Sequence, residues 1–190
     1  YPATVCVSVN EEVVHGIPSA KRALREGDIV SLDIGVKRNG WFGDAARTFP
    51  VGKVSPLATK LLETTERALA QGIERAREGG RVSDISAAIE KEAKGAGLSV
   101  VRALVGHGIG RALHEEPQVP NYGQPGTGAK LQAGMVLAIE PMVNAGVPDV
   151  VTLADQWTVV TADRKISAHF EHTVAIGAAG PEVLSRVEAH

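Results

Sequence analysis

The sequence predicts an α+β fold in which two helices pack on one face of a sheet. Strand-like runs occupy the first part of the 190-residue chain and return after residue 97. Between them, residues 55–79 and 83–95 repeat apolar side chains at helical spacing. The order strands, two helices, strands is typical of folds whose helices lie together on one side of a sheet.

The first strands are predicted by local patterns. Residues 4–9 alternate apolar and polar side chains with β-branched content, which indicates a short strand. Residues 10–19, with breakers at Gly16 and Pro18, predict a loop. The runs 28–36 and 41–49 flank Asn39-Gly40, the dipeptide that favours a two-residue hairpin turn because both positions need positive φ.

Two helices follow. Ser55-Pro56 predicts the start of the first, with serine as N-cap and proline at the first helical position. We expect Gly79-Gly80 to end it. Its apolar face is predicted to contain Leu57, Leu61, Leu62, Thr65, Leu69, Ile73 and Ala76. The second helix is predicted from Ser83 to Gly95.

The remainder predicts strands at 98–105, 135–143, 156–161 and 168–176, with a Gly-rich loop after the first. We find no linker, low-complexity segment or repeat, so residues 1–190 are expected to form a single domain. The chain enters almost at once into the apolar alternation Val5, Val7, Val9, as though the opening segment of the domain were missing.

Composition excludes several classes of function. The 20 Lys+Arg and 22 Asp+Glu are nearly balanced, and no basic cluster is long enough for a nucleic-acid footprint. No apolar run approaches the roughly 18 residues that cross a bilayer. The single cysteine, Cys6, excludes an internal disulfide and suits a reducing compartment, so we expect a cytoplasmic protein.

Acidic residues stand inside apolar runs. Asp33 lies in IVSLDIGV, Glu140 in MVLAIEPMV and Glu171 in AHFEHTVAI. A buried, unpaired carboxylate costs several kcal/mol, on the order of the penalty for any isolated buried charge, so such acids are usually paired or metal-bound. For any one of them, a strand edge facing water is an equal alternative. Three of them, with Asp44, favour a site.

The hairpin relates two of these acids. If Asn39-Gly40 is a two-residue loop, Asp33 faces Ala46, and Asp44 lies on the same face as Ala46. Diagonal neighbours on a sheet are roughly 7–8 Å apart, within reach of a shared cation. A loop of odd length would place the two aspartates on opposite faces.

The segment GHGIGRALHEEPQVPNYG, residues 106–123, contains His107 and His114 among three glycines. Glycine lets a backbone approach its neighbours closely or adopt positive φ, as a loop that presents a ligand requires. A phosphate cradle is not favoured, because the GxGxxG register is absent. For either histidine alone, an ordinary hydrogen-bonded residue is the more common alternative.

Together these residues form a predicted metal-ligand set: Asp33, Asp44, His107, Glu140 and Glu171. Four carboxylates with one imidazole suit divalent Mn, Fe(II) or Co rather than a structural zinc site. With so many carboxylates, two ions sharing acids are expected. Such a pair can activate water and polarise a carbonyl, as amide hydrolysis requires.

Five segments, in order, resemble signature segments of the type I methionine aminopeptidases of peptidase family M24: NEEVVHGIP, DIVSLDIGVKRNGWFGDAARTF, GHGIGRALHEEPQVPNYG, AIEPMVN and FEHTVAI. The resemblance implies the pita-bread fold, an antiparallel sheet with helices on its outer face around two metal ions. It implies that Asp33 chelates one ion, that Asp44 and Glu171 bridge both, and that His107 and Glu140 complete the other. The short interval from Glu140 to Glu171 favours type I over type II.

The resemblance also implies catalytic and substrate-binding roles. Glu140 would take a proton from the attacking water, His114 would steady the tetrahedral intermediate, and His15 would contact the substrate backbone. The methionine side-chain pocket would be formed by Tyr1, Cys6, Leu113 and Trp157. An ordinary sheet aromatic is an equal alternative for Trp157, and a small buried hydrophobe for Cys6.

These observations predict a monomeric enzyme that removes the initiator methionine from new polypeptides, with no nucleic-acid or membrane partner. A proline-directed peptidase, prolidase or aminopeptidase P, is the nearest alternative, because it shares the fold and the five ligands. A pita-bread binding module that has lost catalysis is the other.

Overall fold

The computed structural model describes residues 1–186 and centres on one antiparallel sheet. Its strands run in the order β1-β3-β4-β13-β8-β6-β7, and β14 pairs with β13. The bounds are β1 Cys6–Val9, β3 Ile29–Arg38, β4 Trp41–Pro50, β6 Val105–Gly108, β7 Glu115–Pro120, β8 Val136–Ile139, β13 Glu171–Gly177 and β14 Gly180–Val183. The late strand β13 therefore lies in the middle, between β4 and β8.

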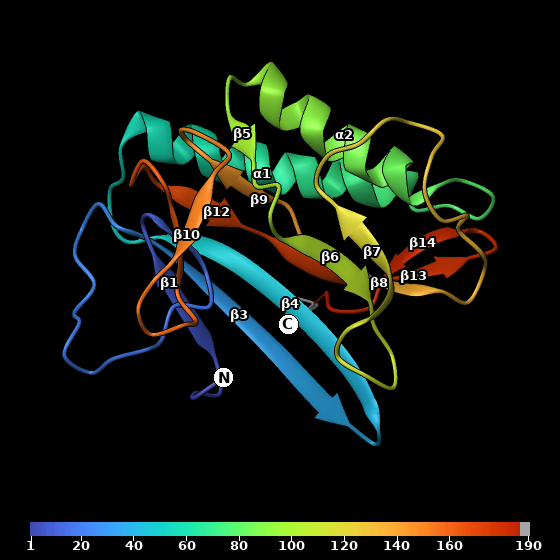
Figure 1. Ribbon diagram of the computed structural model, residues 1–190, viewed down its shortest axis with the longest axis horizontal. Helices are drawn as coiled ribbons and strands as arrows, with labels where there is room; N and C mark the ends of the chain where they lie inside the picture. Colours follow the sequence, from blue (N-terminus) through green and yellow to red (C-terminus); the bar gives the residue numbers. More distant parts are fainter. Residues whose placement is uncertain (187–190) are drawn as a thin grey trace.

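The hairpin β3–β4 forms as predicted. Asn39 and Gly40 have φ values of 51° and 80°, the positive values that the predicted turn requires. Asp33 pairs with Ala46, and Gly35 pairs with Asp44, so the predicted register is confirmed. In Figure 1 the long hairpin extends from the body of the molecule, away from the helices.

The helices α1 (Pro56–Arg75) and α2 (Val82–Gly95) lie side by side along one side of the sheet (Figure 1). Ser55 caps α1 by accepting the Ala58 N–H, as expected. The helix ends before the predicted Gly79-Gly80. Leu57, predicted to be inward, is 46% exposed, so it lies outside the buried face of α1.

The core between these helices and the sheet is aliphatic. Leu61, Leu69, Ile85 and Ile89 of the helices pack with the inward side chains of β8 and β13. Gly72 lets the helices approach closely, since a Cβ there would lie 3.0 Å from the side chain of Ile89. This packing covers one face of the sheet and holds β8 and β13 in place.

Two small sheets complete the fold. One has the order β10-β11-β2, with β10 Val150–Thr152, β11 Val159–Thr161 and β2 Glu12–Val14. The other has the order β12-β9-β5, with β12 Ser167–His169, β9 Met142–Asn144 and β5 Ser99–Val100. The strands predicted at 98–105, 135–143 and 168–176 are therefore each divided in two.

Two predicted loops contain strands. β2 lies within the predicted loop 10–19, and its Val13 and Val14 are buried in a small second core. β7 lies within the predicted Gly-rich loop and contains Pro117 and Pro120. Proline is tolerated there because β7 is an edge strand. No helix among the described residues is long and apolar enough to cross a membrane.

Candidate metal centre

The candidate site lies on one face of the large sheet, where β3, β4, β13 and β6 bring acids and an imidazole together. Asp33 of β3 and Asp44 of β4 share that face, because Asp44 is opposite Gly35. The Thr173 hydroxyl accepts the Asp44 N–H at 2.8 Å and donates to the Asp44 carbonyl at 2.7 Å. These two hydrogen bonds to one hydroxyl hold the backbone of Asp44 against β13.

Three ligating atoms converge from three strands. One oxygen of Asp44, one of Glu171 and one ring nitrogen of His107 lie within 4.8 Å of one another. Glu171 is 2% exposed and pairs with Ala46 at the start of β13. His107 stands in β6 opposite Ala138 of β8. The topology thus places residues that are far apart in the sequence around one point.

The tautomer of His107 follows from its surroundings. Its Nδ1 lies 2.9 Å from the Gly108 carbonyl oxygen, which can only accept, so Nδ1 carries the proton. Nε2 then offers a lone pair toward the acids. A backbone carbonyl that orients the imidazole in this way is the usual companion of a metal-binding histidine.

Glu140 stands in the break between β8 and β9. Its Oε1 lies 3.5 Å from His107 Nε2, and its Oε2 lies 3.4 Å from Nε2 of His169. The strand stops here because Pro141 has no N–H to continue the ladder. The carbonyl of Glu140 accepts the amide of Asn121 at 3.2 Å. The fifth predicted ligand thus reaches the same group of side chains.

Burial raises the pKa of each acid. The pKa values of Asp33 and Asp44 are raised, and that of Glu171 is raised well above its ordinary value, with burial the largest cause. Burial raises the pKa of Glu140 to about 8. Neighbouring acids add to the shift at Asp33, Glu140 and Glu171. A divalent cation would relieve this repulsion, so the donor set fits a metal ion.

Glycines give β6 its close neighbours, as the sequence predicted. A Cβ on Gly106 would clash with the Ala138 carbonyl, and one on Gly108 would clash with the Glu116 carbonyl. Both carbonyls belong to segments that flank His107. The two glycines therefore fix how deeply the imidazole enters the sheet.

His114 lies beside His107, with ring centroids 4.3 Å apart and the rings edge to face. The loop between them is tied to the hairpin, because the Phe42 N–H donates to the Gly110 carbonyl at 2.8 Å. The Arg111 guanidinium also stacks 3.8 Å from the centre of the Trp41 ring. These contacts place His114, which is exposed, at the mouth of the site.

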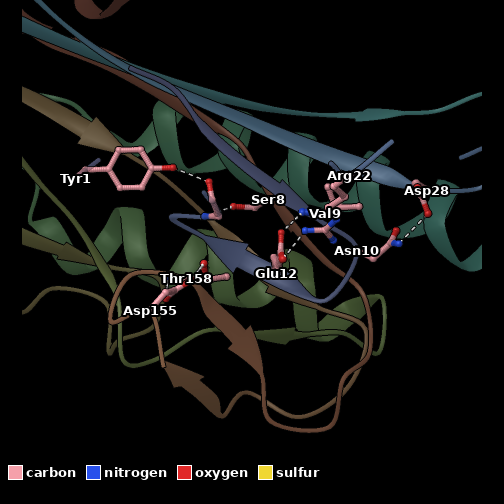
Figure 2. Close-up of polar contacts among 10 residues, drawn as sticks. Tyr1, Ser8, Val9, Asn10, Glu12, Arg22, Asp28, Asp155 and Thr158 are labelled. Carbon is pink, nitrogen blue, oxygen red and sulfur yellow. Dashed lines mark hydrogen bonds and ion pairs between the residues drawn. The ribbon is translucent and has the colours of Figure 1, made fainter. Parts of the chain in front are cut away.

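His15 is set by the segment next to β1. It has φ 60°, and Gly16 after it donates its N–H to the Ser8 hydroxyl at 3.0 Å. The Tyr1 hydroxyl donates to the Gly16 carbonyl at 2.6 Å (Figure 2). Burial, and secondarily His169, lowers the pKa of His15, which keeps its imidazole neutral.

Three of the four predicted pocket residues gather at the start of the chain. The rings of Tyr1 and Trp157 meet edge to face with centroids 5.6 Å apart. Cys6 pairs with Asp33 across β1 and β3, and burial followed by the Asp33 charge raises the pKa of its thiol to about 11. Leu113 lies against Gly35 of the hairpin, two residues along β3 from Asp33.

The turn after β1 is held by a row of polar contacts (Figure 2). Glu12 accepts the Val9 N–H at 2.8 Å and pairs with Arg22 at 2.6 Å. Asn10 donates to Asp28 at 2.8 Å. These contacts fix β1 against β3, and so fix Cys6 beside Asp33.

The structure adds His169 and Asn121, which the sequence prediction missed. His169 is 2% exposed and precedes Glu171 by two residues. Two residues is the same-face spacing of a strand, and that spacing could have drawn attention to it. Asn121 lies in a segment that was predicted to be loop, and nothing in its local pattern indicates burial.

Comparison with known proteins gives a consistent result. The model of metallopeptidase family M24 matches residues 1–178. Methionine aminopeptidase 1 of Bacillus subtilis is 56% identical over 187 residues, which cover 98% of this chain and 75% of that protein. Methionine aminopeptidase of Aquifex aeolicus is 46% identical, with 98% and 73% covered.

Solved structures extend the likeness to the fold. A methionine aminopeptidase from Thermotoga maritima superposes with a TM-score of 0.95 at 48% identity, over 96% of this chain and 74% of that one. A prolidase from Pyrococcus furiosus superposes with a TM-score of 0.76 at 23% identity, over 98% and 50%, and so shares the fold alone. The fold is thus the pita-bread fold that the resemblance implied, and the chain belongs to metallopeptidase family M24 and, within it, to the methionine aminopeptidases.

Proposed function

We propose that this chain removes the N-terminal methionine from polypeptides by metal-assisted hydrolysis of the first peptide bond. The convergence of Asp44, His107 and Glu171 within 4.8 Å carries the proposal. Buried acids with raised pKa values are costly, and a site that binds divalent cations accounts for that cost. The identity with proteins named methionine aminopeptidases supports methionine as the residue released.

The five ligands would hold two divalent ions. Asp33 would chelate one ion, Asp44 and Glu171 would bridge both, and His107 with Glu140 would complete the other. Such ions supply Lewis-acid activation of water and of the scissile carbonyl. Four carboxylates and a neutral imidazole favour Mn, Co or Fe(II).

Three residues would act on the substrate directly. Glu140 would accept the proton of the attacking water, since its carboxylate lies beside His107 in the ligand set. His114, exposed beside His107, would donate a hydrogen bond to the developing oxyanion. His15, neutral because it is partly buried, would hold the substrate backbone.

The methionine side chain would enter the space beside Tyr1 and Trp157. Their edge-to-face rings and the Cys6 thiol offer apolar and polarizable surface next to Asp33. Thioethers contact aromatic rings favourably. Leu113 would contribute from the hairpin side.

We further propose that residues 1–190 work as a single catalytic domain. The protein would be a cytoplasmic monomer whose partners are the N-termini of nascent proteins.

Hydrolysis of Met-Gly-Met by chelator-stripped protein tests the function. We expect methionine release only after Mn, Co or Fe(II) is added, and no release from an Xaa-Pro dipeptide. Preference for the Xaa-Pro substrate would instead support the proline-directed alternative. A protein that binds no metal and cleaves neither substrate would support a binding module and refute the proposal.

A further inference from the structure

His169 ends β12 at the point where the chain crosses from the small sheet into β13. It pairs with Met142 of β9, so it lies across from the residues that follow Glu140. The next residue, Phe170, donates its N–H to the Pro141 carbonyl at 3.3 Å. The two breaks, at Glu140-Pro141 and at Phe170, therefore lie side by side.

The backbone of His169 is held from both sides by one hydroxyl. Thr48 Oγ1 accepts the His169 N–H at 2.9 Å and donates to the His169 carbonyl at 2.8 Å. The Ser31 hydroxyl lies 2.7 Å from Thr48 Oγ1 and supplies the remaining proton. All three residues are buried. The backbone position from which the His169 imidazole extends is therefore fixed.

The ring of His169 faces Glu140. Its Nε2 lies 3.4 Å from Glu140 Oε2 and, within residues 1–186, has no hydrogen-bond partner in good geometry. A buried polar atom without a partner is rare in a folded protein. Glu140 is therefore the group that Nε2 is placed to serve.

The two oxygens of Glu140 meet different partners. At Oε1 stands His107 Nε2. In the neutral ring this atom carries the lone pair, because Nδ1 donates to Gly108, and two electron-pair donors then face each other. Such a pair requires a cation or a proton between its members. Against Oε2, His169 Nε2 can carry a proton and donate it. We propose that His169 is a positioning residue that binds Oε2 of Glu140, leaving Oε1 for the ion that His107 holds.

This inference rests on the proposed function and adds a residue to it. A carboxylate free to rotate can offer either oxygen to the ion, whereas a bonded Oε2 selects one. Loss of a hydrogen bond that orients a metal ligand weakens metal binding by about 10- to 100-fold. The ion held by His107 and Glu140 would weaken, and the ion held by Asp33 would not.

Calorimetric titration of chelator-stripped protein with Mn tests the assignment, using His169→Leu, His169→Gln and the parent chain. Leucine removes the donor, while the glutamine amide keeps an N–H at similar reach. We expect the leucine variant to lose about 10- to 100-fold in affinity for one of two ions, and the glutamine variant to remain within about threefold of the parent. The Co(II) absorption spectrum should change in the leucine variant alone.

His172→Leu is the matched control, since His172 is a half-buried histidine that bonds the Ser185 hydroxyl at 2.9 Å. It should leave metal binding unchanged.

For turnover of Met-Gly-Met, His169→Leu should lower kcat and leave KM unchanged, and His169→Gln should restore kcat.

Equal affinities in all three proteins would overturn the positioning role while the proposed function stands. Loss of one ion in both His169 variants, with the fold intact by circular dichroism, would also overturn it, because Nε2 would then be a ligand itself. A parent chain that binds no Mn and releases no methionine would refute the proposed function, and the assignment of His169 would fall with it.

Discussion

The backbone and the carboxylate of Asp44 have separate roles. Its backbone is bonded twice to Thr173, while its carboxylate meets His107 and Glu171. The fold therefore fixes the residue independently of any ion. Chemistry and stability should separate cleanly when the carboxylate alone is changed.

We expect Asp44→Asn to lower methionine release by at least about 10³-fold, because a neutral amide cannot bridge two cations. The free energy of unfolding of the metal-free variant should match or exceed that of the parent, since a buried acid with a raised pKa is removed. Activity assays and denaturant titrations measure both. Asp149→Asn, an exposed acid, is the control. Unchanged activity with metal bound would contradict the ligand assignment.

Thr48 is the second residue whose role can be isolated. Thr48→Val keeps the shape of the side chain and removes the hydroxyl that serves Ser31 and both backbone groups of His169. Leaving buried polar groups unpaired costs about 1–3 kcal/mol each. We expect the free energy of unfolding to fall by at least about 2 kcal/mol in urea titration. A loss below about 0.5 kcal/mol, the size typical of a surface substitution, would contradict the role of Thr48 in holding the His169 backbone.

At the scale of single residues, the sequence indicated which acids belong to the site, but it did not indicate the residues that contact and orient them. Asp33, Glu140 and Glu171 are recognisable because a charge inside an apolar run conflicts with burial. His169 carries no such conflict, since a histidine beside apolar residues is unremarkable. Its importance comes from a neighbour in the fold, Glu140, that the sequence does not place beside it.

Among the elements, the hairpin was the most predictable because its information is local. Asn39-Gly40 sets the turn, and the turn sets the register of Asp33 against Ala46. The divided strands were not predictable from periodicity, which continues across the breaks at Pro141 and Phe170. β7 was missed because Pro117 and Pro120 resemble loop residues unless the strand is known to lie at an edge.

β6 depends on its glycines, and Gly106 tests this. In Gly106→Ala the added methyl would meet the carbonyls of Ala138 and Val119, which cannot move without breaking the sheet. We expect a loss of about 2 kcal/mol or more in the free energy of unfolding, together with weaker metal binding as His107 is displaced. Gly43→Ala is the control, because a Cβ there meets nothing within 4 Å. Equal behaviour of the two variants would refute the close approach.

For the whole molecule, the raised pKa values of the acids predict how stability depends on pH. The folded chain binds protons at Glu140 up to about pH 8, whereas an unfolded glutamate releases them near its ordinary value of 4.5. Stability from this group is therefore full at low pH and is lost as pH rises toward 8. His15, His169 and His172 have lowered pKa values and act oppositely below 6.5.

The metal-free protein should accordingly lose stability between pH 6.5 and 8, where the histidines no longer oppose the acids. One such group contributes about 1.4 kcal/mol per pH unit. With saturating Mn the slope should disappear, because the acids are then ionised in the folded protein as they are in the unfolded chain. Urea titrations at several pH values measure it, with Glu140→Gln expected to flatten the metal-free slope. A metal-free protein that gains stability over this range would contradict the buried-acid description.

The overall class, helices on one face of an antiparallel sheet, was predictable from the order of the elements. The strand order was not. Nothing in residues 171–177 indicates that they pair with β4 on one side and β8 on the other. Long-range pairing is decided by which apolar faces meet, and a linear pattern does not contain that information.

The central place of β13 has a consequence for how the chain reaches its final form. During synthesis β4 and β8 are complete long before residue 171 is available, and until then each presents an unpaired edge. The sheet is joined only when this late segment enters between them, a contact of high sequence separation that slows folding. The same event brings Glu171 to Asp44. The folding step that removes two aggregation-prone edges is thus also the step that assembles the candidate metal centre.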